Sequence, residues 1–374
     1  MVDLGSQYQR IQNEIDQSVL EVIRSTAFIN GPAVKRFSEN LAKFLKVKHV
    51  IPCANGTDAL QIALMALDLE PGDEVITSDF TFISTAEVIA LLNLKPVLVD
   101  VLPDTFNIDA QAVRKAITPK TKVIIPVHLY GQTADMDEIM AIAKEHQLYV
   151  IEDAAQSIGS QYFSNDGNTY YSGTMGHIGC TSFFPSKNLG AYGDGGAIFT
   201  NDDSLAEKLA ALANHGMKVR YYHDFIGVNS RLDTIQAAIL DVKLKYLNEY
   251  NQRRNQAAQY YDQKFSHHPN IQIPYRDPKS THVFHQYTLK VPSEHRNALQ
   301  KYLAEKEIPS MLYYPVPFHR QKAYQGYGYK DEDFPVSNYL SEVVLSLPMH
   351  SELSEEQLEY ITETVLEYFK QNGK

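Results

Sequence analysis

Residues 122–156, KVIIPVHLYGQTADMDEIMAIAKEHQLYVIEDAAQ, decide the fold that we expect for this chain. The stretch opens on a run of β-branched and other apolar residues and closes near a second such run, LYVI at 148–151. Between the two runs, the apolar residues of 134–147 recur at helical spacing. A buried strand, a helix and another buried strand in this order are typical of a parallel sheet with helices on both faces.

The same alternation continues on both sides of this stretch. Upstream strands are expected at 49–54, 74–78 and 96–101, and the helices that follow them at 57–69, 84–94 and 110–117. Two more strand-like runs lie within 178–200. We therefore predict an α/β fold with a large, doubly wound, mostly parallel sheet that binds its ligand at the carboxyl ends of the strands.

Three parts are expected along the chain. Residues 1–30 would form an N-terminal helical arm, residues 31–245 the large domain, and residues 246–374 a smaller C-terminal α+β domain. The smaller domain is assigned from four segments, which are strands at 282–291 and 310–315 and helices at 296–307 and 355–369.

The composition excludes several classes of protein. The chain has 34 Lys and Arg residues against 45 Asp and Glu residues, so we expect no nucleic-acid partner, because such proteins carry a basic surface. Cys53 and Cys180 lie in apolar runs without metal-binding spacing, and no metal site is expected. The sequence shows no secretory signal and no apolar run of about 20 residues, so we expect a cytoplasmic protein without a membrane partner.

Lys187 is a charged residue in an unexpected setting. The stretch FFPSKNLGAYGDGGAIFT at 183–200 places it between two Phe residues and a glycine-rich turn that leads back into a strand. Partial burial lowers the pKa of a lysine because it disfavours the charged form, and a neutral amine can form a Schiff base with a carbonyl. The alternative is a structural lysine whose stem covers apolar surface while its charge stays in water.

Asp153 ends the strand that closes the deciding stretch. This residue, within EDAAQS at 152–157, is expected at the carboxyl end of a buried parallel strand and therefore beside the ligand crevice. A buried carboxylate is costly unless it is paired, so it would face a cationic group. The alternative is an aspartate that caps the following helix.

Two further segments carry residues that suit an anion. Gly56 and Thr57 open a helix, where backbone N–H groups and the helix dipole favour a phosphate, although an ordinary helix cap is the alternative. Arg231, in GVNSR at 227–231, suits bidentate recognition of a carboxylate or phosphate. Asn229 in the same segment could contact the anion or could cap the helix that follows.

Together these residues form one consistent set, with an anion site, a carboxylate and an amine at one edge of a parallel sheet. Pyridoxal 5′-phosphate (PLP) needs these three groups. Its phosphate would lie at the helix that begins near Gly56, and its aldehyde would react with Lys187. Asp153 would keep the pyridine nitrogen protonated, so that the ring can accept electrons.

Four motifs carry a resemblance to a known family: NGTDAL at 55–60, EDAAQS at 152–157, the stretch at 183–200, and GVNSRLDTIQAAIL at 227–240. Over nearly its whole length the chain resembles the sugar aminotransferases of the DegT/StrS type, which are PLP enzymes of the aspartate-aminotransferase fold (fold type I). Within this family it is most similar to the enzymes that act on UDP-2-acetamido-2-deoxy-3-oxo-glucuronate.

The resemblance implies a role for each residue of the set. Lys187 would form the internal aldimine and shuttle protons, Asp153 would pair with the pyridine nitrogen, Gln156 would contact the phenolic oxygen, and Phe82 would stack on the ring. The phosphate would be held by Gly56, Thr57 and Ser182. Asn229 would join them from a second subunit. The family works as a homodimer with a shared active site, and the same assembly is implied here.

The implied reaction has two halves. L-glutamate would convert PLP to pyridoxamine 5′-phosphate, which would then aminate a keto sugar carried on a nucleotide diphosphate, with Lys187 as base and acid. The most similar subgroup makes a 3-amino sugar for the O-antigen of lipopolysaccharide. Arg231 would suit the carboxylate of this sugar, and three more residues are expected at the substrate: Tyr313, Tyr314 and His319.

Two features depart from that subgroup and keep other substrates open. Tyr313-Tyr314 stands where the subgroup has a His-Tyr pair, and residues 160–173 lengthen a loop. A dTDP-linked 3-keto- or 4-keto-6-deoxyhexose is therefore the alternative acceptor, and a packed loop with satisfied polar groups is the alternative role for His319. The sequence leaves open the keto position, the nucleotide, whether the sugar is a uronate, and the pathway.

Two other kinds of activity are possible on the same fold. A PLP-dependent sugar dehydratase is disfavoured, because those relatives are expected to have a histidine in the place of Lys187. A sensor or regulatory protein without catalysis is disfavoured by the complete set of Asp153, Gln156, Ser182 and Lys187.

Overall fold

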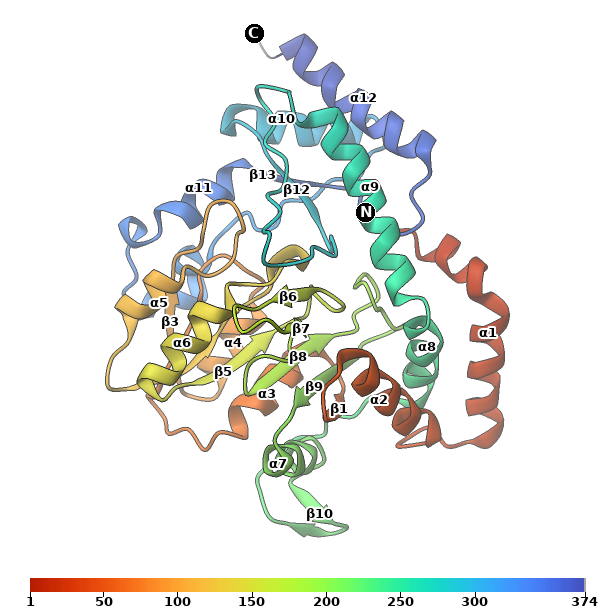
Figure 1. The fold of residues 1–374 in the computed structure, drawn as a ribbon, viewed down its shortest axis with the longest axis vertical. Helices are drawn as coiled ribbons and strands as arrows, with labels where there is room; N and C mark the ends of the chain where they lie inside the picture. Colours follow the sequence, from red (N-terminus) through yellow and green to blue (C-terminus); the bar gives the residue numbers. More distant parts are fainter. Residues whose placement is uncertain (373–374) are drawn as a thin grey trace.

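A seven-stranded sheet forms the centre of the computed structural model, which describes residues 1–372 (Figure 1). The strands lie in the order β1-β9-β8-β5-β4-β2-β3. Their bounds are β1 His49–Cys53, β2 Glu74–Ser78, β3 Lys95–Val99, β4 Thr121–Ile125, β5 Tyr149–Asp153, β8 Ile178–Ser182 and β9 Gly196–Thr200. Neighbouring strands are parallel except that β9 runs antiparallel to both β8 and β1. The predicted mostly parallel sheet is confirmed.

Helices cover both faces of this sheet. Successive strand residues are buried on opposite faces, as with Ile151 in the core beneath one helical layer and Val150 in the core beneath the other. One layer contains α3 Gly56–Met65, α4 Ser84–Leu91 and α7 Asp203–Ala213. The other contains α2 Pro32–Leu45, α5 Ala110–Ala116, α6 Met136–His146 and α8 Thr234–Leu244. Burial on both faces explains why the strands read as continuous apolar runs.

The N-terminal helix α1, Leu4–Ser25, packs along α8 at one side of the large unit (Figure 1). Ile11 and Ile15 of α1 share a small buried cluster with Ile239 and Val242 of α8. This contact attaches the first helix to the segment that follows the GVNSR motif.

The C-terminal unit has a core of its own. Its elements are α9 Leu247–Phe265, β12 Tyr287–Lys290, α10 Ser293–Glu305, α11 Pro335–Val343, β13 Val344–Leu347 and α12 Glu355–Asn372. Helices α9, α10 and α12 bury apolar side chains against the antiparallel pair β12–β13. The division into three parts, with boundaries after residues 30 and 245, stays a prediction.

The strand predicted at 310–315 is wrong. Within it only Met311 pairs, through one isolated bridge to Ser346, and the partner of β12 is β13. Tyr313 and Tyr314 pack instead beside the apolar cluster around Phe80. The aromatic run that suggested a strand therefore serves side-chain packing rather than backbone pairing.

Two hairpins and four short 3-10 helices complete the part of the chain that the structure describes. Strands β6 Gln161–Phe163 and β7 Thr169–Tyr171 form the lengthened loop, and β10 Met217–Val219 and β11 Tyr222–His223 form a hairpin that projects from the body below α7 (Figure 1). The 3-10 helices are η1 Leu129–Gly131, η2 Phe318–Arg320, η3 Lys322–Tyr327 and η4 Asp331–Asp333. Within residues 1–372, no helix combines the length and apolar character needed to cross a membrane.

Candidate functional site

Lys187 lies in the loop between β8 and β9, at the carboxyl end of β8. Its backbone N–H donates to the carbonyl of Phe184 at 2.8 Å, and its side chain is half-buried. Burial lowers the pKa of the Lys187 amine to about 8, although the nearby Asp153 carboxylate acts in the opposite direction. Phe183 is buried against Phe37, whereas Phe184 is 51% exposed, so one of the two flanking aromatics shields the loop within this chain.

Asp153 ends β5, and its buried carboxylate is held by two hydrogen bonds. The hydroxyl of Thr85 donates to Oδ2 at 2.7 Å, and the backbone N–H of Ala155 donates to Oδ1 at 3.1 Å. Thr85 is fully buried in the first turn of α4. Thr85 was not predicted from the sequence, where its only signal was a polar residue in the first turn of a helix that follows a strand after a short loop.

Glu152, the neighbour of Asp153, has a different environment. Its fully buried carboxylate faces the fully buried ring of His128 at 2.8 Å and accepts from the backbone N–H groups of Gly173, Met175 and Gly176. These bonds hold the turn that leads into β8. Glu152 therefore supports the architecture, and Asp153 is the acid beside the lysine.

Gly56 opens α3 and packs directly on Ser182. A Cβ added at Gly56 would lie 2.7 Å from the Cβ of Ser182, so a larger residue has no room. The side chain of Asn55 caps α3 by accepting from the N–H of Asp58 at 2.8 Å. The cap expected as the alternative is thus present. The contact of Gly56 with Ser182 places the N-terminus of α3 at the end of β8, where the loop of Lys187 begins.

Gln156, Tyr313, Tyr314 and Phe82 meet at one place. The amide of Gln156 accepts from the backbone N–H of Tyr130 at 2.7 Å and donates to the hydroxyl of Tyr314 at 3.0 Å. The ring of Tyr314 lies 6.4 Å from the ring of Phe82, which is 53% exposed, and the hydroxyl of Tyr130 donates to the carbonyl of Tyr313. Burial raises the pKa of the Tyr314 hydroxyl, which stays protonated at neutral pH.

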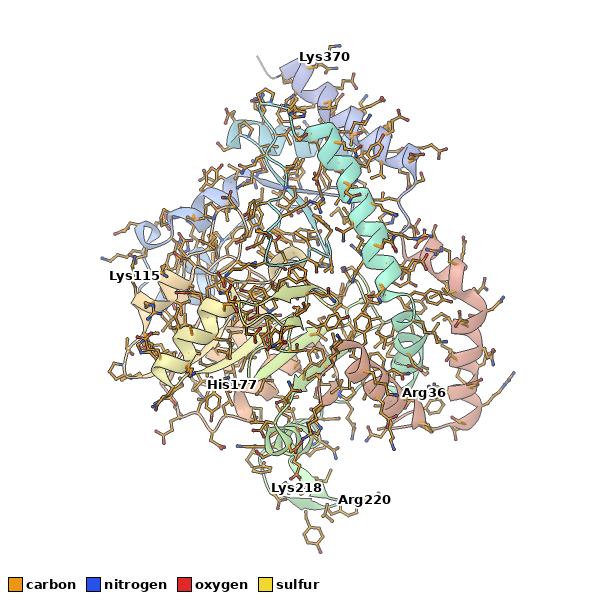
Figure 2. The ribbon with its side chains drawn as sticks, in the orientation of Figure 1. Arg36, Lys115, His177, Lys218, Arg220 and Lys370 are labelled. Atoms are coloured by element: carbon orange, nitrogen blue, oxygen red, sulfur yellow. The ribbon has the colours of Figure 1, made fainter. Side chains whose placement is uncertain are left out.

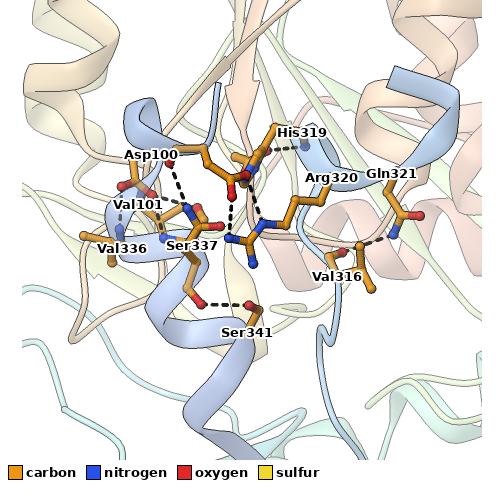
Figure 3. A network of polar contacts seen from close by, with 12 residues as sticks. Asp100, Val101, Val316, His319, Arg320, Gln321, Val336, Ser337 and Ser341 are labelled. Atoms are coloured by element: carbon orange, nitrogen blue, oxygen red, sulfur yellow. Dashed lines mark hydrogen bonds and ion pairs between the residues drawn. The ribbon is translucent and has the colours of Figure 1, made fainter. Parts of the chain in front are cut away.

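His319 is buried between two carboxylates. Its Nδ1 lies 2.7 Å from Asp79 and its Nε2 lies 3.0 Å from Asp331, while Arg320 forms a bidentate pair with Asp331. Burial alone would lower the pKa of His319, but the hydrogen bonds to the two carboxylates raise it. Figure 3 shows His319 and Arg320 in this network, beside the bonds by which Asp100 holds the start of α11. Both ring nitrogens are occupied, which favours the packed-loop alternative for His319.

Asn229 and Arg231 lie on either side of Ser230, which ties their segment to the large sheet. The hydroxyl of Ser230 accepts from the backbone N–H of Ala54 at 3.0 Å, just before Asn55 and Gly56. Asn229 is exposed and Arg231 is half-buried. Helix α8 begins at Thr234 with Asp233 as its cap residue, so the alternative in which Asn229 caps this helix is wrong.

No group of three or more potential metal ligands comes together among residues 1–372. The described residues instead bring an amine, a carboxylate with a fixed orientation, and a helix N-terminus to the carboxyl edge of one sheet. Ligands of such sheets bind at this edge.

Comparison with known proteins identifies similar chains of almost the same length. The model of the DegT/DnrJ/EryC1/StrS aminotransferase family matches residues 9–366. A pleiotropic regulatory protein of Geobacillus stearothermophilus is 48% identical over 99% of this chain and 98% of its own length. The UDP-2-acetamido-2-deoxy-3-oxo-D-glucuronate aminotransferase of Pseudomonas aeruginosa is 46% identical over 96% and 97%. A dTDP-3-amino-3,6-dideoxy-alpha-D-galactopyranose transaminase of Aneurinibacillus thermoaerophilus is 42% identical over 98% of each chain.

Solved structures agree with the fold. DesV of S. venezuelae in complex with a ketimine intermediate superposes with a TM-score of 0.94 at 36% identity, over 98% of this chain and 97% of that one. The ntda protein of Bacillus subtilis, with bound cofactor PMP, superposes with a TM-score of 0.88 at 33% identity, over 96% and 82%.

Proposed function

The chain belongs to the DegT/DnrJ/EryC1/StrS aminotransferase family, and we propose from this membership and from the site that it is a PLP-dependent nucleotide-sugar aminotransferase. L-glutamate is the amino donor. The acceptor is UDP-2-acetamido-2-deoxy-3-oxo-glucuronate, and the product is the 3-amino sugar used for the O-antigen of lipopolysaccharide. The relative from Pseudomonas aeruginosa, which is 46% identical, supports this acceptor.

One observation carries the proposal. Lys187 has an amine whose pKa is lowered to about 8 by burial, and it lies near the Asp153 carboxylate at the edge where α3 begins. A structural surface lysine has no reason to be desolvated there, because its charge would favour water. At neutral pH a useful fraction of this amine is neutral, and only the neutral form is a nucleophile.

The residues present fit PLP. The phosphate would lie against Gly56, Thr57 and Ser182, where the absence of a Cβ at Gly56 leaves the helix N-terminus open to close approach. Asp153, oriented by Thr85, would pair with the ring nitrogen, and the partly exposed ring of Phe82 would stack on the cofactor. When bound, PLP supplies an aldehyde that carries the amino group and a ring that withdraws electrons from the substrate.

Two side chains of the protein, Lys187 and Gln156, act directly in the proposed reaction. The Nζ atom of Lys187 holds and moves the proton, and its pKa near the working pH suits a group that must act as base and then as acid. Gln156 is fixed by Tyr130 and Tyr314, so that its amide keeps one orientation toward the ring oxygen of the cofactor.

In the proposed enzyme, a second copy of the chain contributes residues to the active site. Asn229 is exposed and would reach the phosphate of a partner's site, in a homodimer with shared active sites. Lys218 and Arg220 lie on the exposed β10–β11 hairpin (Figure 2), where they could provide cations for the diphosphate of the substrate. Arg231 would bind the sugar carboxylate, with Tyr313 and Tyr314 beside the reacting carbon.

A second acceptor class is favoured by a specific relative. The transaminase of Aneurinibacillus thermoaerophilus, which is 42% identical, is named for a dTDP-linked 3-amino-6-deoxy sugar. A dTDP-linked 3-keto- or 4-keto-6-deoxyhexose is therefore the alternative acceptor. It carries no carboxylate, so it would not need Arg231.

The test is nitrogen transfer from ¹⁵N-labelled L-glutamate to a panel of keto sugars, followed by mass spectrometry. The panel contains the UDP-linked 3-keto uronate, its neutral 3-keto counterpart, and dTDP-linked 3-keto- and 4-keto-6-deoxyhexoses. We expect label in the 3-amino uronate, and Arg231→Gln should raise KM for the uronate but not for the neutral counterpart. Activity restricted to dTDP sugars would replace the acceptor, and no transfer to any sugar would overturn the function.

A further inference from the structure

The residue that follows Lys187 is attached to the C-terminal unit. Asn188 is 3% exposed, and its side-chain nitrogen donates to two acceptors of that unit. These are the side-chain oxygen of Asn251 on α9, at 2.8 Å, and the carbonyl of Val283, at 2.9 Å. Satisfied hydrogen bonds between buried groups make a structure rigid, so the loop that carries the lysine is held from outside the large sheet.

Asn251 also contacts the segment that follows Asp153 and Gln156. Its side-chain nitrogen donates to the carbonyl of Ile158 at 3.2 Å. The same nitrogen packs on Gly159, where an added Cβ would lie 2.6 Å from it. Gly159 has a φ of +85°, which glycine adopts without a steric penalty. The chain therefore leaves room at this turn for the amide of Asn251.

The orientations of both amides follow from their backbone partners. A backbone carbonyl can only accept a hydrogen bond, so the side-chain nitrogen of Asn188 faces Val283 and that of Asn251 faces Ile158. The side-chain oxygen of Asn251 is then the atom that accepts from Asn188. Two hydrogen bonds in series therefore connect the lysine loop to the segment of Asp153 through a single side chain.

The amine and the acid of the candidate site lie on the two segments that this side chain joins. Lys187 directly precedes Asn188, and Asp153 lies five positions before Ile158. The pairing of β5 with β8 ends at Asp153 and Cys180, so the loops beyond need other contacts to keep their spacing. This spacing matters for a reaction, because a shift of about 1 Å between reacting groups can slow it about 100-fold.

We propose that Asn251 is a positioning residue, which holds Lys187 at its working distance from Asp153 by bonding to both loops at once. Asn188 is the contact through which Asn251 acts on the lysine. The role deepens the proposed function and rests on it, since Lys187 is the reacting amine there and Asp153 the acid that orients the cofactor. Because α9 belongs to the C-terminal unit, that unit takes part in the chemistry at the edge of the large sheet.

The first test titrates Lys187 in the full-length protein stripped of cofactor. Limited acylation with an amine-reactive reagent at a series of pH values, followed by mass spectrometry of the Lys187 peptide, gives the pH of half-maximal labelling. We expect a midpoint near pH 8 for the parent protein, because burial lowers the pKa of the amine to about 8. Asn251→Leu should raise the midpoint by about 0.5–1 pH unit, because a loosened loop exposes the amine to water and its pKa returns toward 10.5.

A double-mutant cycle tests whether the two amides act through the bond that they share. Asn188→Leu should raise the midpoint as Asn251→Leu does. The double substitution should shift it by no more than the larger single shift, because the second change removes a bond that is already lost. Shifts that add would mean that the two residues act independently, and would overturn the proposal. If Asn251→Leu does not fold, Asn251→Ser replaces it, since serine is too short to reach both loops.

Asn255→Leu is the matched control. Asn255 lies one turn further along α9, and its side-chain nitrogen donates to the carbonyls of Asn251 and His282. The substitution removes a side-chain amide of the same helix and leaves the bonds to Asn188 and Ile158 in place. A midpoint that is the same in Asn251→Leu and the parent protein, or that shifts equally in Asn255→Leu, would refute the positioning role.

Nitrogen transfer from labelled glutamate provides a second readout. Asn251→Leu should lower the rate at saturating glutamate about tenfold and change KM for glutamate less than about twofold, because misplaced reacting groups slow the chemical step more than they weaken binding. A higher KM with an unchanged kcat would show that Asn251 serves binding instead. Failure of the proposed function would appear separately, as absence of nitrogen transfer by the parent protein, and it would leave the acylation result standing.

Discussion

The hydroxyl of Thr85 donates a 2.7 Å hydrogen bond to the carboxylate of Asp153, although 68 positions separate the two residues in the sequence. The bond joins the first turn of α4 to the end of β5 and leaves the carboxylate little freedom to rotate. Because hydrogen bonds to charged groups are stronger than neutral ones, the bond fixes the orientation of the carboxylate firmly.

Thr85→Val should therefore weaken both the cofactor site and the reaction. Loss of one hydrogen bond to a buried charge costs about 1.5–3 kcal/mol, which corresponds to a roughly 10- to 100-fold weaker binding of PLP or a lower kcat/KM. Fluorescence titration of the stripped protein with PLP measures the first effect, and glutamate-dependent nitrogen transfer measures the second. Thr81→Val is the control, because the buried hydroxyl of Thr81 has no partner among the described residues. Equal effects of the two substitutions would contradict the assignment.

Gly56→Ala should weaken the anion site and also destabilise the fold. The added Cβ would meet the Cβ of Ser182 at 2.7 Å and would push the start of α3 away from the loop that follows β8. We expect at least tenfold weaker binding of PLP, and of inorganic phosphate as a competitor, with a destabilisation of about 1–3 kcal/mol. Gly326→Ala serves as the control, since a Cβ there meets nothing within 4 Å. Unchanged phosphate binding in Gly56→Ala would remove Gly56 from the site.

The main sheet could be predicted because its signal is local. Each strand, such as β5, buries alternate residues on two faces, and this leaves an apolar run that stands out from the helical patterns around it. The direction of β9 carries no such signal. It is antiparallel because the loop 183–195 turns the chain straight back without a crossover helix. The segment 310–315 misled the prediction, because aromatic residues suit side-chain packing as well as strands.

The residues of the candidate site also differ in whether a local sequence signal marks them. Lys187, Asp153 and Gly56 could be proposed because a strand end or a helix start marks each of them in the sequence. Asp79 and Thr85 could not, because their significance depends on contacts with residues far away in the chain. The ring of His319 meets Asp79 across 240 positions, and the hydroxyl of Thr85 meets Asp153 across 68. Local sequence patterns are enough to identify the reacting groups, whereas the groups that orient them can be identified only in the folded chain.

Lys187→Met should stabilise the protein stripped of cofactor. The pKa of Lys187 falls from 10.5 in the unfolded chain to about 8 in the folded one, so burial of the charged amine costs stability at every pH below 8. The cost fades as the pH rises from about 8 to 10.5, where the unfolded state still binds a proton that the folded state has lost. Urea unfolding at pH 7 should show a gain of up to about 3 kcal/mol, which shrinks toward zero near pH 10.5.

Lys187→Met should also lose the aminotransferase reaction. Borohydride treatment in the presence of PLP should label Lys187 in the parent protein and leave Lys187→Met unlabelled at that peptide, and nitrogen transfer should cease. Lys243→Met is an instructive comparison, because Lys243 is also buried with a lowered pKa but donates to the carbonyl of Gly190. A Lys187→Met protein that still transfers nitrogen would show that another amine is the reacting group.

The loop at 316–334 should loosen as the pH rises. The hydrogen bonds to Asp79 and Asp331 raise the pKa of His319 above its usual value of 6.5, despite its burial. Its contribution to stability is therefore fully present below pH 6.5 and is lost as the pH rises through the folded-state pKa. Hydrogen exchange of peptides from this loop, corrected for the intrinsic effect of pH, should show less protection at pH 8.5 than at pH 6.

His319→Gln should abolish this pH dependence, because glutamine stays neutral over the whole range and cannot form an ion pair with either carboxylate. Asp331→Asn should keep the dependence but move it to lower pH, since one of the two carboxylates that raise the pKa of His319 is gone. His268→Gln is the control, as His268 lies in the C-terminal unit and burial lowers its pKa. Loop protection that is the same at both pH values in the parent protein would mean that His319 holds the loop without carrying a charge. The aspartates would then act as hydrogen-bond partners alone.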